Sequence, residues 1–421
     1  MAIPSIAFIP SGFKASKAYS VLPTNGNADL DVARNSTANR INKDGLIEEM
    51  AINVPLLDYS DSTCPSLLLQ PQSINLITYP LTFSDAYWTK TGSTVTSGQS
   101  FPSVDYPSGA FKLGASTSTS TPKYVNSSVV TVGGGTATIT TETIYVKAGE
   151  ITKIGLQEGH YEYAYVTFDL TNTVVLTTGG TGYISNSIKL LSNGWYRLSL
   201  TFTSHSSGTL KTTACLLDDS YVSGTPKSYA YAGVVGQGLY IYGSQVETLS
   251  YPTSLMLPVT EGSTTTRLKD EVSKSGLSSE INSVEGTLFV DIKLNIDTNQ
   301  NILTLGDGSS SNTVSMAFSN PQVSMYVNSG GVSQSNFVYT FSDITLNNKI
   351  AIKYKENNFS YYVNGVKVSE DLSGSTFSLN TLDRLVFNIG YGPNALYGKI
   401  ADLKVYSTAL TDSELIALTT I

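Results

Sequence analysis

The sequence contains few histidines that could act in catalysis or bind a metal. The 421 residues include two histidines, His160 and His205, and both stand among polar residues typical of turns. A serine–histidine–acid triad needs a nucleophile and an orienting acid around its histidine, and zinc sites combine several histidines or cysteines. We therefore expect neither kind of site.

Glycoside hydrolysis is less demanding, because it needs only two carboxyl groups about 5 to 10 Å apart. Four acids in the middle of the sequence could supply such a pair: Glu142, Glu158, Glu162 and Asp169. Glu and Asp side chains are mostly exposed in folded proteins, so we interpret all four as solvated surface acids. The sequence then predicts no catalytic residue and a protein that is not an enzyme.

Oxygen ligands that suit Ca²⁺ occur together at Asp297, Asn299 and Asp307-Gly308. Asp, Asn and Gly also form turns without any metal. We favour turns, which predicts no metal ligand and no cofactor. A Ca²⁺ ion near Asp307 is the alternative.

The run 161–170 is the strongest candidate for ligand binding. If it is a strand, alternate residues share a face. Ala164, Val166, Phe168 and Leu170 would then face the core, and the rings would line the other face beside Thr167. Flat rings next to hydrogen-bonding groups suit the apolar face of a sugar. This pattern predicts glycan binding by Tyr161, Tyr163, Tyr165 and Asp169. The alternatives are rings covered by a neighbouring chain, and packing between strands.

The clearest structural element is the stretch 193–203. Asn193-Gly194 is a turn dipeptide, and strict alternation follows it, with Tyr196, Leu198, Leu200 and Phe202 on the apolar face. This pattern predicts a half-buried antiparallel strand, with Trp195 at its rim. Further short runs between Gly- and Ser-rich turns predict a sandwich of seven or more strands: 137–146, 151–156, 161–170, 173–178, 195–203, 209–217 and 238–246.

The composition points away from several classes of partner. Charged residues are 14% of the chain, below the ~25% usual for soluble domains, and the net charge is −8. Nucleic acid needs clustered cations and is not expected. No 18-residue apolar run and no signal peptide are found, so we expect no membrane insertion. Cys64 and Cys215 are interpreted as two buried thiols and not as a bridge.

Several stretches resemble bacteriophage fibre and spike proteins that contain a jelly roll similar to carbohydrate-binding modules. They are the arginine- and serine-containing leader 32–48, 53–59, 64–72, 83–90, 145–149, 195–203, 239–247 and 251–254. The stretch 64–72 departs from the family at Gln70, where an acid is usual. The resemblance implies a virion protein that is assembled in the host cytoplasm and exposed on the particle.

The C-terminal third resembles concanavalin-A-like, laminin-G-like sandwiches. It begins with the alternating run 285–292, contains a hairpin with Asn364-Gly365 at its tip, and ends with the strand 398–406. A capping box at Thr411-Asp412-Ser413-Glu414 predicts one terminal helix. Glycanases of this fold usually carry closely spaced acids on one strand, and no such cluster occurs between 284 and 421. The loop at Tyr391 and Asn394 is the second choice for a glycan site.

Together these features predict an all-β chain with two tandem sandwiches. The expected parts are an N-terminal attachment segment (1–72), a jelly roll (73–258), a linker (259–283) and a concanavalin-A-like sandwich (284–421). A short helix is expected at 270–281. The segment 1–72 has little apolar pattern and should dock on the jelly roll, a sister subunit or the virion.

The resemblance implies a head or tail fibre or spike that contacts a host cell-surface glycan. It also implies a homotrimer bound to other virion structural proteins through the N-terminal segment. The alternatives are a virion-associated glycan-degrading enzyme and a purely architectural capsid decoration.

Overall fold

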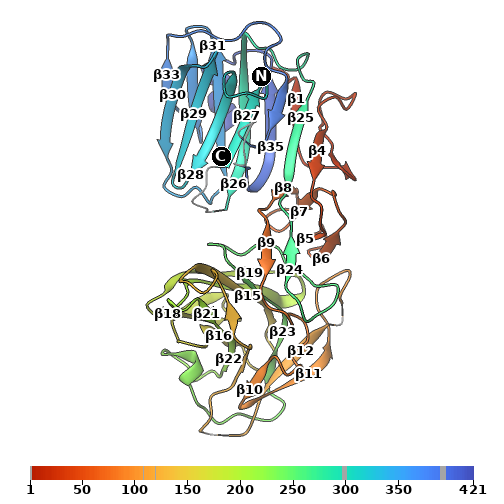
Figure 1. Ribbon diagram of the computed structural model, residues 1–421, viewed down its shortest axis with the longest axis vertical. Coiled ribbons are helices and arrows are strands. Elements are labelled where there is room, and N and C mark those ends of the chain that lie inside the picture. Colours follow the sequence, from red (N-terminus) through yellow and green to blue (C-terminus); the bar gives the residue numbers. More distant parts are fainter. Residues whose placement is uncertain (1, 108, 119, 296–300, 389–394) are drawn as a thin grey trace. The chain divides into compact units, whose positions relative to one another are not determined.

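The computed structural model describes residues 2–107, 109–118, 120–295, 301–388 and 395–421, and within them strands dominate (Figure 1). The chain forms two compact units. Unit 1 comprises Met1–Thr37, Met50–Pro71 and Leu268–Ile421, and unit 2 comprises Ala38–Glu49 and Gln72–Arg267. The predicted all-β class is confirmed.

Unit 2 is a sandwich of two antiparallel sheets. The first sheet has the order β10 (Thr89–Thr91), β13 (Tyr124–Asn126), β22 (Thr212–Leu217), β16 (Lys153–Glu158), β17 (Tyr165–Asp169), β18 (Val174–Gly179). The second has the order β11 (Ser93–Gln99), β12 (Ala110–Ala115), β23 (Gly238–Glu247), β15 (Ile139–Lys147), β20 (Trp195–Thr203), β19 (Tyr183–Leu190). Small pairs are β14 (Val130–Thr131) with β21 (Thr209–Leu210), β9 (Ser73–Asn75) with β24 (Thr265–Arg267), and β5 (Ala38–Ile41) with β6 (Ile47–Met50).

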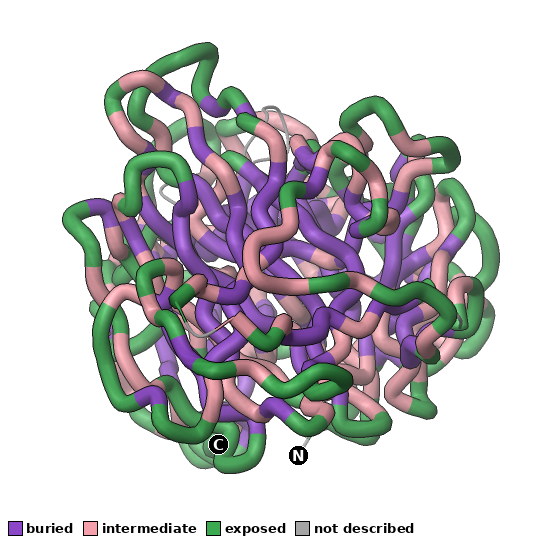
Figure 2. The backbone as a smooth tube through the Cα atoms, turned by 90° about the horizontal axis from the view of Figure 1, so that it is seen from below, coloured by how far each residue is buried: buried purple, intermediate pink, exposed green. Residues whose placement is uncertain are grey.

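The predicted core face of β20 is confirmed, since Tyr196, Leu198, Leu200 and Phe202 all belong to the core between these sheets. The expected half-buried character is wrong. Trp195 is 1% exposed and packs with Phe101, ring centroids 5.0 Å apart, in a second apolar cluster. Because β20 is paired on both sides and covered on both faces, few of its side chains reach solvent. In Figure 2 the purple, buried stretches lie mainly along strands and the green, exposed ones mainly in loops.

Unit 1 is also a two-sheet sandwich. One sheet has the order β33 (Val366–Asp371), β32 (Phe359–Val363), β31 (Asn348–Lys355), β26 (Glu285–Leu294), β35 (Gly398–Tyr406), β8 (Ser66–Leu69), β7 (Leu56–Asp58), and β1 (Ile6–Phe8) also pairs with β35. The other has the order β2 (Phe13–Lys14), β3 (Lys17–Ala18), β4 (Leu30–Ala33), β25 (Glu271–Ser275), β34 (Arg384–Val386), β27 (Asn301–Gly306), β28 (Thr313–Ser319), β29 (Gln322–Ser329), β30 (Val332–Thr340).

The N-terminal segment is not a separate attachment domain in this structure. Ile6, Phe8, Leu30 and Leu67 are fully buried in the same core as the C-terminal strands. The sequence pattern is weak because these strands are only two to four residues long, too short to show a clear alternation. We expected the segment to dock on the jelly roll, a sister subunit or the virion. Most of it instead packs into the sandwich formed with the C-terminal strands.

A buried ion pair joins this segment to Asp270, the residue directly before β25. Arg34 Nη1 lies 2.9 Å from Asp270 Oδ1, and both side chains are at most 2% exposed. The same guanidinium donates hydrogen bonds to the backbone carbonyls of Ser36, Ala51 and Val54, each at 3.0 Å. Because a buried guanidinium needs its donors satisfied, these contacts fix the path of the N-terminal chain within unit 1.

The stretch 259–283 differs from the predicted linker and helix. Residues 265–267 form β24 in unit 2, and residues 271–275 form β25, which pairs with β4 and β34 in unit 1. The polar composition that suggested a linker describes only the exposed residues 259–264. Sheet neighbours that are distant in sequence override the weak local preference for helix at 270–281.

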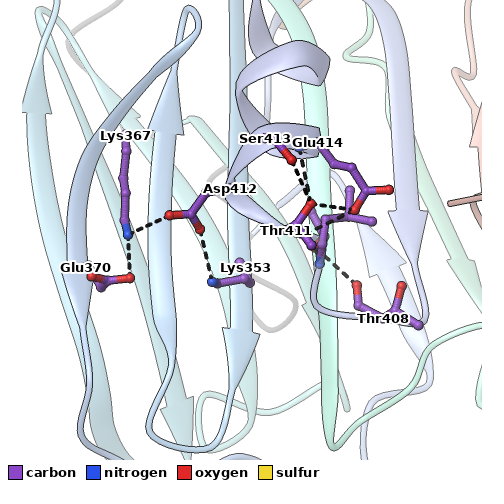
Figure 3. A network of polar contacts seen from close by, with 10 residues as sticks. Lys353, Lys367, Glu370, Thr408, Thr411, Asp412, Ser413 and Glu414 are labelled. Atoms are coloured by element: carbon purple, nitrogen blue, oxygen red, sulfur yellow. Dashed lines mark hydrogen bonds and ion pairs between the residues drawn. The ribbon is translucent and has the colours of Figure 1, made fainter. Parts of the chain in front are cut away.

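The C-terminal helix confirms its predicted cap. Helix α1 (Asp412–Thr419) begins after Thr411, whose hydroxyl accepts a hydrogen bond from Glu414 N–H while the Glu414 carboxylate accepts one from Thr411 N–H (Figure 3). Asp412 forms ion pairs with Lys353 and Lys367 at 3.6 and 3.1 Å, which tie the first turn of α1 to β31 and β33.

The hairpin at Asn364-Gly365 is confirmed as well, because Val363 pairs with Val366 and both turn residues have positive φ.

Both cysteines are free, and Cys64 is exposed, so only Cys215 matches the buried thiol that we predicted. Among the described residues, no helix has the length and apolar character that crossing a membrane requires.

Candidate functional site

The predicted tyrosine platform does not exist as one strand face. Strand β17 begins at Tyr165, and Tyr161 and Tyr163 lie in the preceding loop 159–164. Glu162 has φ of +58°, a left-handed conformation that breaks the alternation of a strand. The predicted core residues are confirmed, since Ala164, Val166, Phe168 and Leu170 are all buried in the core of unit 2.

The loop instead brings Tyr161 against both histidines of the chain. The ring of Tyr161 stacks on His205 with centroids 3.9 Å apart and on His160 at 4.3 Å. Tyr163 meets His205 edge-on at 5.6 Å. Tyr161 is 39% exposed and His160 is also exposed. We call His160, Tyr161, Tyr163 and His205 the rim cluster.

Hydroxyl groups stand directly beside the rim cluster. Ser207 Oγ donates a hydrogen bond to the Tyr161 hydroxyl at 3.1 Å, and Thr209 Oγ1 lies 3.4 Å from the same oxygen. Ser207 Oγ also contacts Thr209 Oγ1 at 2.9 Å and His205 Nδ1 at 3.0 Å. Hydrogen bonds from Ser207 and Thr209 lower the pKa of Tyr161. The surface thus combines exposed rings with a row of donors and acceptors.

A buried carboxylate holds this loop in place. Glu158, at the end of β16, is fully buried. Its carboxylate accepts hydrogen bonds from the backbone N–H groups of His160 at 2.7 Å, Tyr161 at 2.8 Å and Tyr163 at 3.3 Å. A fourth comes from Lys211 N–H at 3.2 Å. Charge-assisted bonds of this kind are strong, so the rings are presented by a rigid loop.

A second buried acid, Glu142 on β15, lies close enough to Glu158 for their charges to interact. It is 1% exposed, and neither carboxylate oxygen has a hydrogen-bond partner among the described residues. Burial raises the pKa of Glu142 to about 8; the Thr212 hydroxyl opposes this, and the charge of Glu158 adds to it. The interpretation of Glu142, Glu158 and Asp169 as surface acids is therefore wrong, because they are 1%, 0% and 8% exposed, whereas Glu162 is exposed as expected.

Tyr165 and Asp169 are not part of the rim cluster. The Tyr165 ring lies over Gly179 of the neighbouring strand, where a Cβ atom would meet it at 2.6 Å. Asp169 is at the opposite end of β17, and its carboxylate accepts hydrogen bonds from the N–H groups of Thr171 and Asn172. Burial alone would raise the pKa of Asp169, but bonds from Asn172 and Thr171 lower it overall. Asp169 thus stabilises the turn that follows β17.

The remaining candidates fall into two groups, one outside the described residues and one in a turn. Tyr391 and Asn394, like Asp297 and Asn299, lie outside the described residues. The Asp307 carboxylate accepts hydrogen bonds from Ser309 N–H at 2.8 Å and Asn312 Nδ2 at 2.7 Å, the geometry of a turn. Across the described ranges, no three His, Cys, Asp or Glu side chains form a group that could hold a metal.

The histidines are the functional candidates that sequence reasoning missed. His205 lies in the connection between β20 and β21, and Tyr161 lies in the connection between β16 and β17. Their meeting depends on which strands pair across the sheets, which the sequence does not reveal. The available signal was the position of both histidines in turns, beside tyrosine in one case and serines in the other.

Comparison with known proteins supports the fold of the C-terminal region. A family model described as the concanavalin A-like lectin/glucanases superfamily matches residues 278–416, in agreement with the expected fold. None of the curated proteins compared with the chain matches it.

Solved structures with similar regions include several binding domains. One is the CBM40 module of the Ruminococcus gnavus IT-sialidase bound to α2,3-sialyllactose, with 20% identity, 34% of this chain and 91% of that chain covered, and a TM-score of 0.30. Another is domain 4 of an extracellular arabinanase from Geobacillus stearothermophilus in complex with arabinotriose (12%, 41% and 83%, 0.29). A third is the binding domain of botulinum neurotoxin DC in complex with rat synaptotagmin II (12%, 36% and 39%, 0.29). Scores this low carry no argument about function.

Proposed function

We propose that this chain is a non-catalytic glycan-binding protein, and that the rim cluster of unit 2 is its glycan-binding surface. The observation that carries the proposal is the stack of His160, Tyr161 and His205, in which Tyr161 lies between the two imidazoles and its hydroxyl is flanked by those of Ser207 and Thr209. The exposed His160 ring at the end of the stack offers a flat face to a sugar, and the adjacent hydroxyls exchange hydrogen bonds with the sugar's own.

The rigidity of the loop supports the same proposal. Glu158 fixes three loop N–H groups from below, so the rings do not lose much conformational freedom when a ligand binds. Binding sites gain affinity when this ordering cost is met before the ligand arrives.

A binding role without catalysis agrees with where the acids lie. Glu142 and Glu158 are at most 1% exposed, and Asp169 is occupied in a turn. A glycosidase needs two carboxyl groups that reach the bond to be cleaved. Beside the rim cluster, Glu162 is exposed, while Glu142 and Glu158 are buried, so this loop presents one accessible carboxyl group and not the pair that a glycosidase needs.

We further propose that the protein belongs to a bacteriophage particle, as a head or tail fibre or spike that contacts a host cell-surface glycan. The support is the resemblance of the leader 32–48 and of the jelly-roll stretches to such proteins. The same resemblance suggests a homotrimer. Because residues 2–71 are folded into the two units, attachment to other virion proteins through this segment would use a folded surface.

Replacement of Tyr161 by alanine tests the glycan site. We expect binding of the intact protein to host cells or their polysaccharide to weaken by about tenfold or more, since about 1.4 kcal/mol corresponds to tenfold in Kd. Multivalent presentation is needed because single sugar contacts are weak. Tyr161→Phe keeps the ring and should lose less.

The matched control is Tyr240→Ala, which removes a half-buried tyrosine of β23 in the same unit. It should leave binding unchanged. Unaltered binding by a folded Tyr161→Ala protein would contradict the proposal, and turnover of the polysaccharide by the unmodified protein would show an enzyme instead.

A further inference from the structure

Unit 1 contains a pocket of about 460 Å³ that is separate from the rim cluster. Its floor is the outer face of β26 and β35, which run side by side in Figure 1. Its walls are the chain that follows β1 and the chain that follows β7. Ligand sites commonly enclose about 300 to 1,000 Å³, so the pocket has the size of a site for a small molecule.

The walls of the pocket are partly apolar. Ile9, Pro10 and Tyr59 line it, and Ile9 is 42% exposed. An exposed isoleucine beside a tyrosine and a proline offers a flat apolar surface within a recess. Such a wall favours a ligand with one apolar face.

The charged side chains of the floor leave hydrogen-bonding capacity for a ligand. Lys399 Nζ is held by Asp58 at 2.7 Å and Asp61 at 2.5 Å. Lys293 is 40% exposed and reaches Asp61 only at 3.6 Å, longer than a hydrogen bond. The ammonium of Lys293 therefore has donors to offer.

Asp291 supplies an acceptor next to Lys293. Its Oδ1 atom is buried and has no hydrogen-bond partner among the described residues. Burial raises the pKa of Asp291, and Lys349 and Lys404 oppose this shift while Asp402 reinforces it. Because Oδ1 is closed off from solvent, a ligand reaches the carboxyl group of Asp291 through the part of it that lines the pocket.

We propose that this pocket binds one neutral sugar ring, with Asp291 and Lys293 contacting its hydroxyl groups and the wall at Tyr59 covering its apolar face. The charges favour a neutral ligand, since the two lysines are balanced by the carboxylates beside them. A metal ion does not fit, because both lysines would repel it and the described residues hold no group of three ligands. This site is additional to the rim cluster and does not depend on it.

The test uses the full chain and four probes: the methyl glycosides of glucose, galactose, mannose and N-acetylglucosamine at millimolar concentration. Ligand-observed saturation-transfer NMR should show saturable binding of at least one. Lys293→Ala and Asp291→Asn should each weaken its Kd by about tenfold or more. Lys293 is a surface side chain, so the first variant keeps the fold even if the second does not.

Tyr240→Ala, outside both sites, is the control and should leave this binding unchanged. Binding that is lost in Tyr161→Ala but kept in both pocket variants would overturn the pocket and support the rim cluster. No saturable binding of any of the four glycosides would overturn the pocket without bearing on host-cell binding through Tyr161.

Discussion

Replacing Glu142 by glutamine should remove most of the pH dependence of stability in unit 2 above pH 5. In the unfolded chain Glu142 loses its proton near the ordinary value of 4.5, whereas burial in the folded chain raises its pKa to about 8. Between these values the folded state binds one more proton than the unfolded state. The free energy of unfolding must therefore fall as pH rises through this window.

The size of the effect follows from the pKa of Glu142. Each pH unit inside the window changes the free energy of unfolding by about 1.4 kcal/mol. From pH 5 to pH 8 the unmodified protein should lose about 4 kcal/mol through this group. Glutamine cannot ionise, so Glu142→Gln should be nearly as stable at pH 8 as at pH 5. Acids with a lowered pKa, such as Asp169, act below about pH 4 and stay outside the window.

Tryptophan fluorescence during urea denaturation measures this for unit 2 alone. The chain has two tryptophans, Trp88 and Trp195, and both lie in unit 2 at 3% and 1% exposure. Glu162→Gln is the matched control. Its carboxyl group is exposed, and its ion pair with Lys227 is long at 3.9 Å, so this change should leave the pH dependence of stability as it is. Equal losses of stability between pH 5 and 8 in the unmodified protein and in Glu142→Gln would refute the argument.

Two further predictions concern unit 1 and the assembly. Asp270→Asn leaves the buried guanidinium of Arg34 without its counter-ion and should lower the free energy of unfolding of unit 1 by about 3 to 5 kcal/mol; calorimetry should show the loss, and Arg34→Met with Asp270→Leu should recover much of it. A loss below about 1 kcal/mol would mean that the pair is solvated. Light scattering of the purified protein should give three times the mass of one chain, and a monomer at micromolar concentration would contradict the trimer.

Local sequence signals predicted the elements whose structure is decided locally. The turn at Asn364-Gly365 and the cap at Thr411 depend on residues within a few positions, and both are confirmed. The apolar face of β20 is confirmed for the same reason. The second face of β20 could not be predicted, because its cover includes Phe101 and Leu255, each more than fifty positions away from Trp195.

The sequence predicted Tyr161 and Tyr163 as site residues but placed them on a strand, and the error has a physical reason. Alternation of Tyr161, Tyr163 and Tyr165 reads as a strand, but Glu162 adopts positive φ and turns the first two rings into a loop. Glu158 draws three N–H groups of that loop toward its carboxylate, which a strand would have offered to a neighbouring strand. A buried carboxylate thus competes with a neighbouring strand for these N–H groups. The alternation of residues in the sequence does not show which of the two will bind them.

The two buried glutamates of unit 2, Glu142 and Glu158, both affect the loop that carries the rim cluster. Glu158 meets its desolvation cost with four N–H donors, and its charge fixes the rings of the rim cluster. Glu142 has no such donors among the described residues, and it stays neutral near pH 7 because burial and the charge of Glu158 both raise its pKa. While Glu142 keeps its proton, no charge on it disturbs the hydrogen bonds between Glu158 and the loop. Above pH 8, an ionised Glu142 should loosen the loop that carries Tyr161.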